Sequence, residues 1–195
     1  LYYGLYWLWW GLHQWDRVVA VPLRPQWSFG FDTLTAYPDA NPEVATADGD
    51  VTRVGVSEAW ATILAGAGNG GSSTSALLNL QIVSAATTDQ WATLGRWIFL
   101  FDTRPLGGGV SIQSAILSVN GNDKFDQLAI TPNIDIYRSN PASNTDVVAA
   151  DYSTLGAVSQ TGSPITFAGW NAAAYNAFTL NVDGRGNIDR QGITK

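Results

Sequence analysis

The chain has 195 residues, of which 46% are hydrophobic and 13% are charged, a composition typical of a folded globular protein. Its formal net charge of -6 repels a phosphate backbone and no basic run offsets this, so nucleic acid is not an expected partner. The absence of cysteine excludes disulfides and thiolate zinc sites, and the single histidine, His13, disfavours a histidine-rich metal site or a Ser-His-Asp triad.

Residues 1–30 differ in composition from the rest of the chain, since they hold more than half of the nine tryptophans. Hydrophobic side chains recur here at alternating steps of four and three residues, the spacing of a helical seam that meets a partner helix. We therefore expect an aromatic arm with a linker, helical in its first part, that joins copies of the chain into a homo-oligomer or fibre. The predicted assembly seam consists of Leu1, Leu5, Leu8, Leu12, Trp15 and Val19.

Two other interpretations of this arm stay open. His13, Asp16 and Arg17 interrupt the apolar run well before the roughly 20 residues needed to cross a bilayer, which leaves contact with a membrane surface as one alternative. Aromatic residues also favour strands, so a strand packed on the main domain is the other.

From residue 31 to residue 195 the sequence indicates an all-β domain. Pro22, Pro25 and Gly30 break regular structure before it. Short β-rich runs then alternate with clusters of Gly, Ser, Asn, Asp and Pro that are typical of turns. These runs are residues 57–64, 77–84, 91–101, 111–119, 134–137, 158–160 and 175–182. We predict an antiparallel two-sheet sandwich, jelly-roll-like, with Trp97 and Phe99 in its core.

Residues 96–195 carry short motifs in a fixed order. They are RWIFLFDT at 96–103, SIQSAILSV at 111–119, NPASNT at 140–145 with ADY at 150–152, and YNAFTLN at 175–181. In this order they resemble the DNRLRE-type domains, β-jelly-roll modules grouped with carbohydrate-binding modules in secreted bacterial and phage-like proteins. The resemblance extends upstream to residue 37, includes none of residues 1–30, and implies a fold rather than a defined activity.

The resemblance also implies one more strand than this sequence contains. Related domains continue past the position of residues 192–195 into a strand of the FGLR type, whereas here the sequence stops. We expect the sandwich to lack its last strand or to accept one from another subunit at an open sheet edge.

Two clusters of oxygen-bearing side chains are candidate calcium ligands, and calcium is the one cofactor that the sequence suggests. Asp48 and Asp50 flank Gly49, while Asn122 and Asp123 lie in a second polar turn. Calcium takes about six to eight oxygen ligands, which loops of Asp and Asn supply. Neither cluster has EF-hand spacing, so turns capped by their own side chains are the competing interpretation.

Sugar recognition requires an exposed aromatic ring beside polar groups, because the apolar face of a pyranose stacks on the ring while its hydroxyls bind amides or carboxylates. Core packing is an equally good interpretation of each such ring. The candidate glycan-binding residues are Trp170, Asn171, Tyr175 and Asn176, with Trp91 and Tyr152 behind them.

Nothing in the sequence marks a catalytic carboxylate pair, so we predict neither enzymatic activity nor catalytic residues. The aromatic arm and the unclosed sandwich favour a structural protein of a surface or virion appendage, such as a phage tail fibre or filament, with a sandwich that contacts glycans outside the cell. The alternative is a free-standing carbohydrate-binding module of a secreted protein.

Overall fold

The computed structural model describes residues 21–23, 32–40, 42–75 and 78–195. The predicted assembly seam lies outside these residues. Strands predominate in the described part and pair antiparallel, which confirms the all-β class. The strands are β1 (Val21–Leu23), β2 (Asp32–Leu34), β3 (Asp48–Glu58), β4 (Gly70–Ser72), β5 (Ile82–Ser84), β6 (Trp91–Phe99), β7 (Phe101–Asp102), β8 (Ile116–Asn120), β9 (Asn133–Ile134), β10 (Ile165–Thr166), β11 (Tyr175–Thr179) and β12 (Ile193–Thr194). The helices are α1 (Trp60–Ala65), α2 (Val182–Gly186) and the 3-10 turns η1 (Arg104–Leu106) and η2 (Ala149–Thr154).

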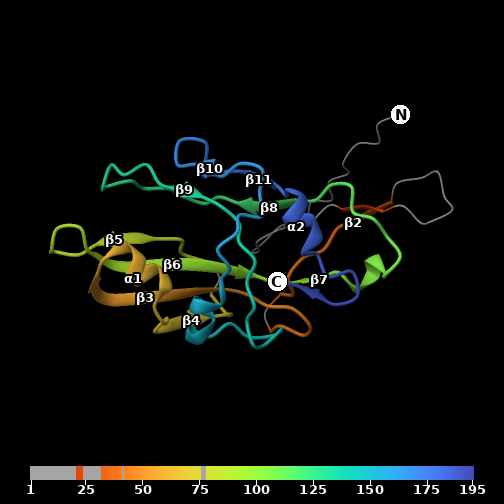
Figure 1. The fold of residues 1–195 in the computed structure, drawn as a ribbon, viewed down its shortest axis with the longest axis horizontal. Coiled ribbons are helices and arrows are strands. Elements are labelled where there is room, and N and C mark those ends of the chain that lie inside the picture. The colour runs from red at the N-terminus through yellow and green to blue at the C-terminus, as the bar shows by residue number, and fades with distance from the viewer. Residues whose placement is uncertain (1–20, 24–31, 41, 76–77) are drawn as a thin grey trace.

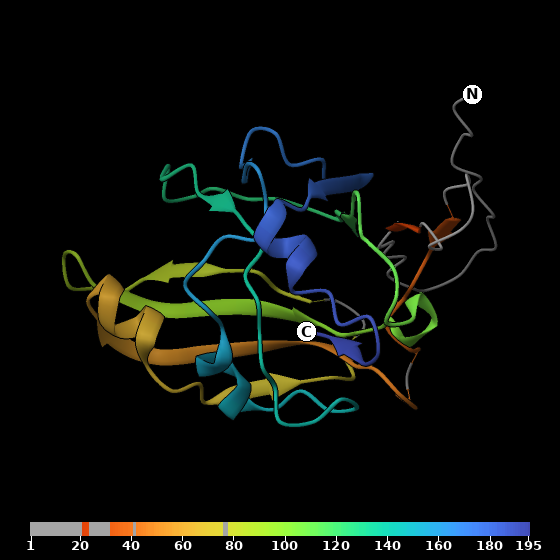
Figure 2. The same ribbon diagram turned by 45° about the vertical axis from the view of Figure 1, so that its right-hand side comes forward.

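A four-stranded antiparallel sheet in the order β4-β3-β6-β5 forms the larger layer. Strands β3 and β6 pair along most of their length, from Asp48 opposite Phe99 to Glu58 opposite Trp91. The pairs β8–β11 and β9–β10 lie on one side of this sheet in Figure 1, and the turned view in Figure 2 shows the same separation. The hydrophobic residues form two clusters. The first lies between β6 and the β8–β11 pair. The second lies on the other face of β3 and β6, where α1 and η2 supply Ile63 and Tyr152.

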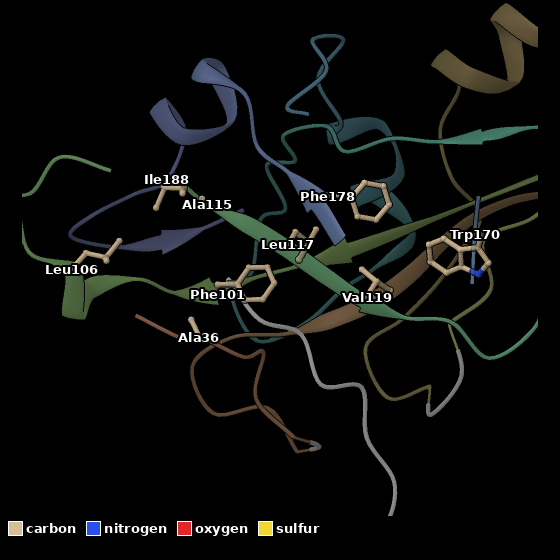
Figure 3. Packing of buried hydrophobic residues seen from close by; sticks show 9 residues of the cluster. All are labelled: Ala36, Phe101, Leu106, Ala115, Leu117, Val119, Trp170, Phe178 and Ile188. Atoms are coloured by element: carbon tan, nitrogen blue, oxygen red, sulfur yellow. The ribbon is translucent and has the colours of Figure 1, made fainter. Parts of the chain in front are cut away.

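Strand β6 supplies side chains to both clusters, because successive residues of a strand point to opposite faces. Trp97 and Phe99 pack against the cluster shared with β8 and β11, which confirms their predicted core position. Leu94 and Ile98 belong to the second cluster, together with Tyr152. Figure 3 shows the first cluster, with Ala36, Phe101, Leu106, Ala115, Leu117, Val119, Trp170, Phe178 and Ile188.

The predicted strand at residues 57–64 is wrong beyond Glu58, because residues 60–65 form helix α1. Ala61 and Ala65 are strong helix formers, and the helix buries Ile63 completely. The true strand lies earlier, at Asp48–Glu58. The Asp-Gly-Asp segment is thus the beginning of a paired strand and not a turn.

Gly49 shows why this strand carries a glycine. A Cβ atom on Gly49 would lie 2.3 Å from the carbonyl oxygen of Ser72 and 2.9 Å from Cβ of Val147. We expect Gly49→Ala to lower the free energy of unfolding by about 1–3 kcal/mol, measured by urea unfolding. Gly109→Ala is the control, since no atom lies within 4 Å of its Cβ position. Equal stability of the two variants would contradict this packing.

The two ends of the described chain are both paired in strands. β1 and β2 pair across the predicted linker, with Pro22 opposite Thr33. The expectation that Pro22 breaks regular structure is therefore wrong. β12 pairs with β7, with Ile193 opposite Asp102. Within the described ranges, no helix is long and apolar enough to span a membrane.

Candidate binding site at the Trp60–Trp91 pair

Trp170 and Asn176, two of the predicted glycan-binding residues, lie in the interior. Trp170 is 5% exposed and its ring centroid is 6.1 Å from that of Trp97. Asn176 is 4% exposed and occupies β11. Stacking on a sugar requires an open ring face, so the prediction of a surface sugar contact at these two residues is wrong. Figure 3 shows Trp170 beside Val119 at one end of the core cluster.

Asn176 instead fixes the turn that precedes β11. Its Oδ1 accepts a hydrogen bond from the backbone N–H of Asn171 at 2.7 Å, and its Nδ2 donates to the carbonyl oxygen of Asn171 at 2.8 Å. The side chain of Asn171 is exposed and accepts from the N–H of Ala173, and Tyr175 is half-buried on β11. This group of predicted residues is therefore mainly structural.

A shallow hollow of about 480 Å³ beside Trp170 is lined by Lys124, Asn171 and small residues. The ammonium group of Lys124 donates to the carbonyl oxygens of Phe167, Ala168 and Trp170 at 2.8–3.3 Å. These bonds hold the turn, and Trp170, the one aromatic residue that lines the hollow, is only 5% exposed.

The candidate calcium ligands lie on separate elements. Asp48 and Asp50 are on β3, and Asn122 and Asp123 are on the connection from β8 to β9. Asp123 accepts a hydrogen bond from the N–H of Lys124, as expected for a capped turn. No group of three or more His, Asp or Glu residues that could hold a metal ion occurs among the described residues.

Asp50 is half-buried between Ser72 and Trp97 of the neighbouring strands. Burial raises the pKa of its carboxyl above the usual value, against a hydrogen bond from the backbone of Asn79 that lowers it. A folded-state pKa above the unfolded one means that stability is lost as pH rises through the interval between them. Ionised Asp50 thus destabilises the fold at neutral pH.

We expect Asp50→Asn to melt at a higher temperature than the natural chain at neutral pH. The difference should shrink as pH falls through the folded and then the unfolded pKa, and vanish below about pH 3, where the carboxyl is protonated in both states. Thermal melts followed by circular dichroism across this pH range measure it. A difference that stays constant with pH would show that charge is not its cause.

A pair of tryptophans, one of them exposed, lies at the end of the large sheet where β3 ends and β6 begins. Trp60 opens helix α1 and is 42% exposed. Its ring meets that of Trp91 at a centroid distance of 5.5 Å and an angle of 69°. Trp91 is half-buried and packs against the second hydrophobic cluster. Figure 1 shows α1 at this end of the sheet.

Hydrogen bonds from the core hold α1 in place. The helix has six residues and no side-chain cap, too little to be stable alone. Tyr152 Oη donates to the carbonyl oxygen of Ile63 at 2.6 Å, and Arg96 Nη2 donates to that of Leu64. Arg53 Nη1 donates to the carbonyl oxygen of Ala67, just beyond the helix. Trp60 is therefore presented by a fixed backbone.

Arg96 and Tyr152 form the centre of this support. The guanidinium carbon of Arg96 lies 4.0 Å from the centroid of the Tyr152 ring, and Nη1 donates to the Tyr152 carbonyl oxygen at 2.6 Å. Burial lowers the pKa of Arg96 and raises the pKa of the Tyr152 hydroxyl. Tyr152, predicted as a secondary sugar contact, is fully buried and so cannot be one.

Polar side chains border the two tryptophans. Arg53 Nε donates to Glu58 Oε2 at 2.7 Å, and a second bond joins Nη2 to Oε1. The hydrogen bond from Arg53 lowers the pKa of Glu58. Ser57 Oγ donates to the amide oxygen of Gln90, the residue before Trp91. A ring face with planar polar groups nearby is the arrangement that sugar binding requires.

Trp60 lies inside the strand predicted at residues 57–64, and Trp91 is only a secondary candidate in the sequence. The two alanines and the leucine of WATILA are the only local signal for a helix here, and they are too few to outweigh the β-favouring Trp, Thr and Ile. A short helix at a sheet end exposes its first residues.

Comparison with known proteins adds no relative. No family model matches the chain, and no curated protein or solved structure matches it significantly.

Proposed function

We propose that the chain is a non-enzymatic structural protein of an extracellular surface or virion appendage, and that its all-β domain contacts glycans through Trp60 and Trp91. The observation that carries this proposal is the exposed Trp60 ring, supported by Trp91 at 5.5 Å and held by an anchored helix. A rigid ring loses little entropy on binding, so even a small platform gives useful affinity when many copies act together.

Further support comes from the chemistry around the pair. Glu58 is bound twice by Arg53, which keeps its pKa low and suits an ion pair better than a general acid. The order of motifs that resembles DNRLRE-type domains also points toward carbohydrate-binding modules. The aromatic seam of residues 1–19 supports self-association into an appendage.

A glycan array followed by titration tests this function. We expect the natural chain to bind a subset of glycans and Trp60→Ala to bind them at least about tenfold more weakly, because the stacking face is lost. Tyr37→Ala is the matched control, since Tyr37 is 48% exposed and lies on a different segment. A blank array, or equal losses in both variants, would contradict the proposal.

Light scattering on the full chain tests the appendage part of the proposal. An oligomer or fibre supports it, and a monomer favours the free-standing carbohydrate-binding module, which would use the same tryptophans.

A further inference from the structure

The angle between Trp60 and Trp91 limits how much of a glycan can stack. Consecutive sugars of a flat, extended polymer stack on rings that lie roughly in one plane, whereas these rings stand 69° apart with their centroids only 5.5 Å from each other. Trp91 is committed to the second hydrophobic cluster, and Trp60 is 42% exposed. Trp60 therefore supplies most of the exposed ring surface, and Trp91 supports it from the side of the core. Such a corner accommodates a single sugar residue.

The charges around the corner also restrict the ligand. Arg53 and Arg96 are the only basic residues on β3, α1 and β6. Arg53 binds Glu58 and the Ala67 carbonyl, and Arg96 binds two backbone carbonyls under the Tyr152 ring. The charge of Arg53 is thus already paired with Glu58, and Arg96 is half-buried against the Tyr152 ring, so neither presents an exposed, unpaired charge to a sugar carboxylate.

Asp89 adds a negative charge close to the pair. It is exposed, two residues before Trp91, in the turn that leads into β6, and its φ of 59° lies in the left-handed region. Asp is among the residues that tolerate this conformation, so the turn is built with a carboxylate at this point. An acidic sugar beside Trp91 would meet this charge without a cation to offset it.

We infer that the Trp60–Trp91 corner binds one uncharged, chain-terminal sugar residue, and neither a run of sugars along a polysaccharide nor an acidic sugar. This inference rests on the proposed function and names the ligand class of the same site. A terminal residue suits the corner because both of its faces and most of its hydroxyls are free of neighbouring sugars.

Titrations of the full chain with defined probes test it. The probes are methyl glycosides of glucose, galactose, mannose and N-acetylgalactosamine, hexasaccharides that end in the same sugars, and galacturonic acid, at about 20 mM and about 500 mM NaCl. We expect a methyl glycoside to bind within about twofold of its hexasaccharide, with no salt dependence and weaker binding of galacturonic acid.

Other results distinguish a wrong ligand class from the absence of glycan binding. A hexasaccharide that binds about tenfold more tightly than its methyl glycoside, or an acidic sugar whose affinity is highest and falls with salt, overturns the inference but keeps glycan binding. If no probe binds, both the inference and the proposed function are wrong. The same holds if Trp60→Ala binds the probes as well as the control Tyr37→Ala does.

Discussion

Replacing Tyr152 by alanine is expected to lower the free energy of unfolding by about 4 kcal/mol. The side chain is fully buried in the second hydrophobic cluster, where its ring lies against the guanidinium of Arg96. Truncation leaves a cavity and removes the ring that covers the half-buried guanidinium of Arg96. It also removes the hydrogen bond from the Tyr152 hydroxyl to the Ile63 carbonyl oxygen. Urea unfolding followed by circular dichroism measures the loss.

Tyr152→Phe is the matched control, because it keeps the ring and removes only the hydroxyl. It should cost about 1–2 kcal/mol, the usual effect of leaving one buried hydrogen-bonding partner unpaired. Because this bond holds α1, we also expect the Phe variant to bind glycans more weakly than the natural chain while remaining folded. Equal destabilisation by Phe and Ala would contradict the role given to ring packing.

Asn176→Ala is expected to lower the free energy of unfolding by about 3 kcal/mol. Four hydrogen bonds depend on this buried amide. Beyond the two to the backbone of Asn171, Nδ2 donates to the carbonyl oxygens of Ala174 at 3.2 Å and Val119 at 3.4 Å. Alanine would remove the partners of the Asn171 N–H and carbonyl oxygen and leave a cavity at a position that is 4% exposed, while the Ala174 carbonyl oxygen would keep its bond from the Gly121 N–H. Thermal and urea unfolding both report the change.

Asn171→Ala separates the amide network from the turn sequence itself. The Asn171 side chain is exposed and makes one hydrogen bond, from the N–H of Ala173 at 2.9 Å. We expect a cost below about 1 kcal/mol. If Asn171→Ala were as harmful as Asn176→Ala, the stability would reside in the turn conformation and not in the buried amide.

Strand β6 is the part of the fold that the sequence predicts best. Its apolar residues sit on both faces, Trp97 toward one cluster and Ile98 toward the other, so the run is continuous and strongly β-favouring. The predicted strand at residues 57–64 is wrong over helix α1 because a short apolar run fits a buried strand or a helix equally well. Only its packing through Ile63 makes it a helix.

The Asp-Gly-Asp segment shows a second limit of sequence reasoning. Its composition is typical of a turn or a cation loop, yet Gly49 is required by the close approach of Ser72 and Val147. Ser72 is some twenty residues away in sequence and Val147 almost a hundred, so no local pattern reports the contact.

The sugar-binding site could not be predicted because the sequence does not specify which tryptophan side chains are exposed. Trp170 beside Asn171 and Trp60 near Gln90 present similar residue types, but Trp170 is 5% exposed and Trp60 is 42% exposed. The difference arises from tertiary packing, because Trp170 is covered by Trp97 and β8 whereas α1 lies at the end of the sheet.

Saturation-transfer NMR between the full chain and a methyl glycoside that it binds shows whether a sugar stacks on Trp60. We expect the protons on the apolar face of the sugar ring to receive the strongest saturation, and we expect Trp60→Ala to remove this signal while Tyr37→Ala keeps it. Equal signals from the natural chain and Trp60→Ala would contradict a sugar site at the Trp60–Trp91 pair.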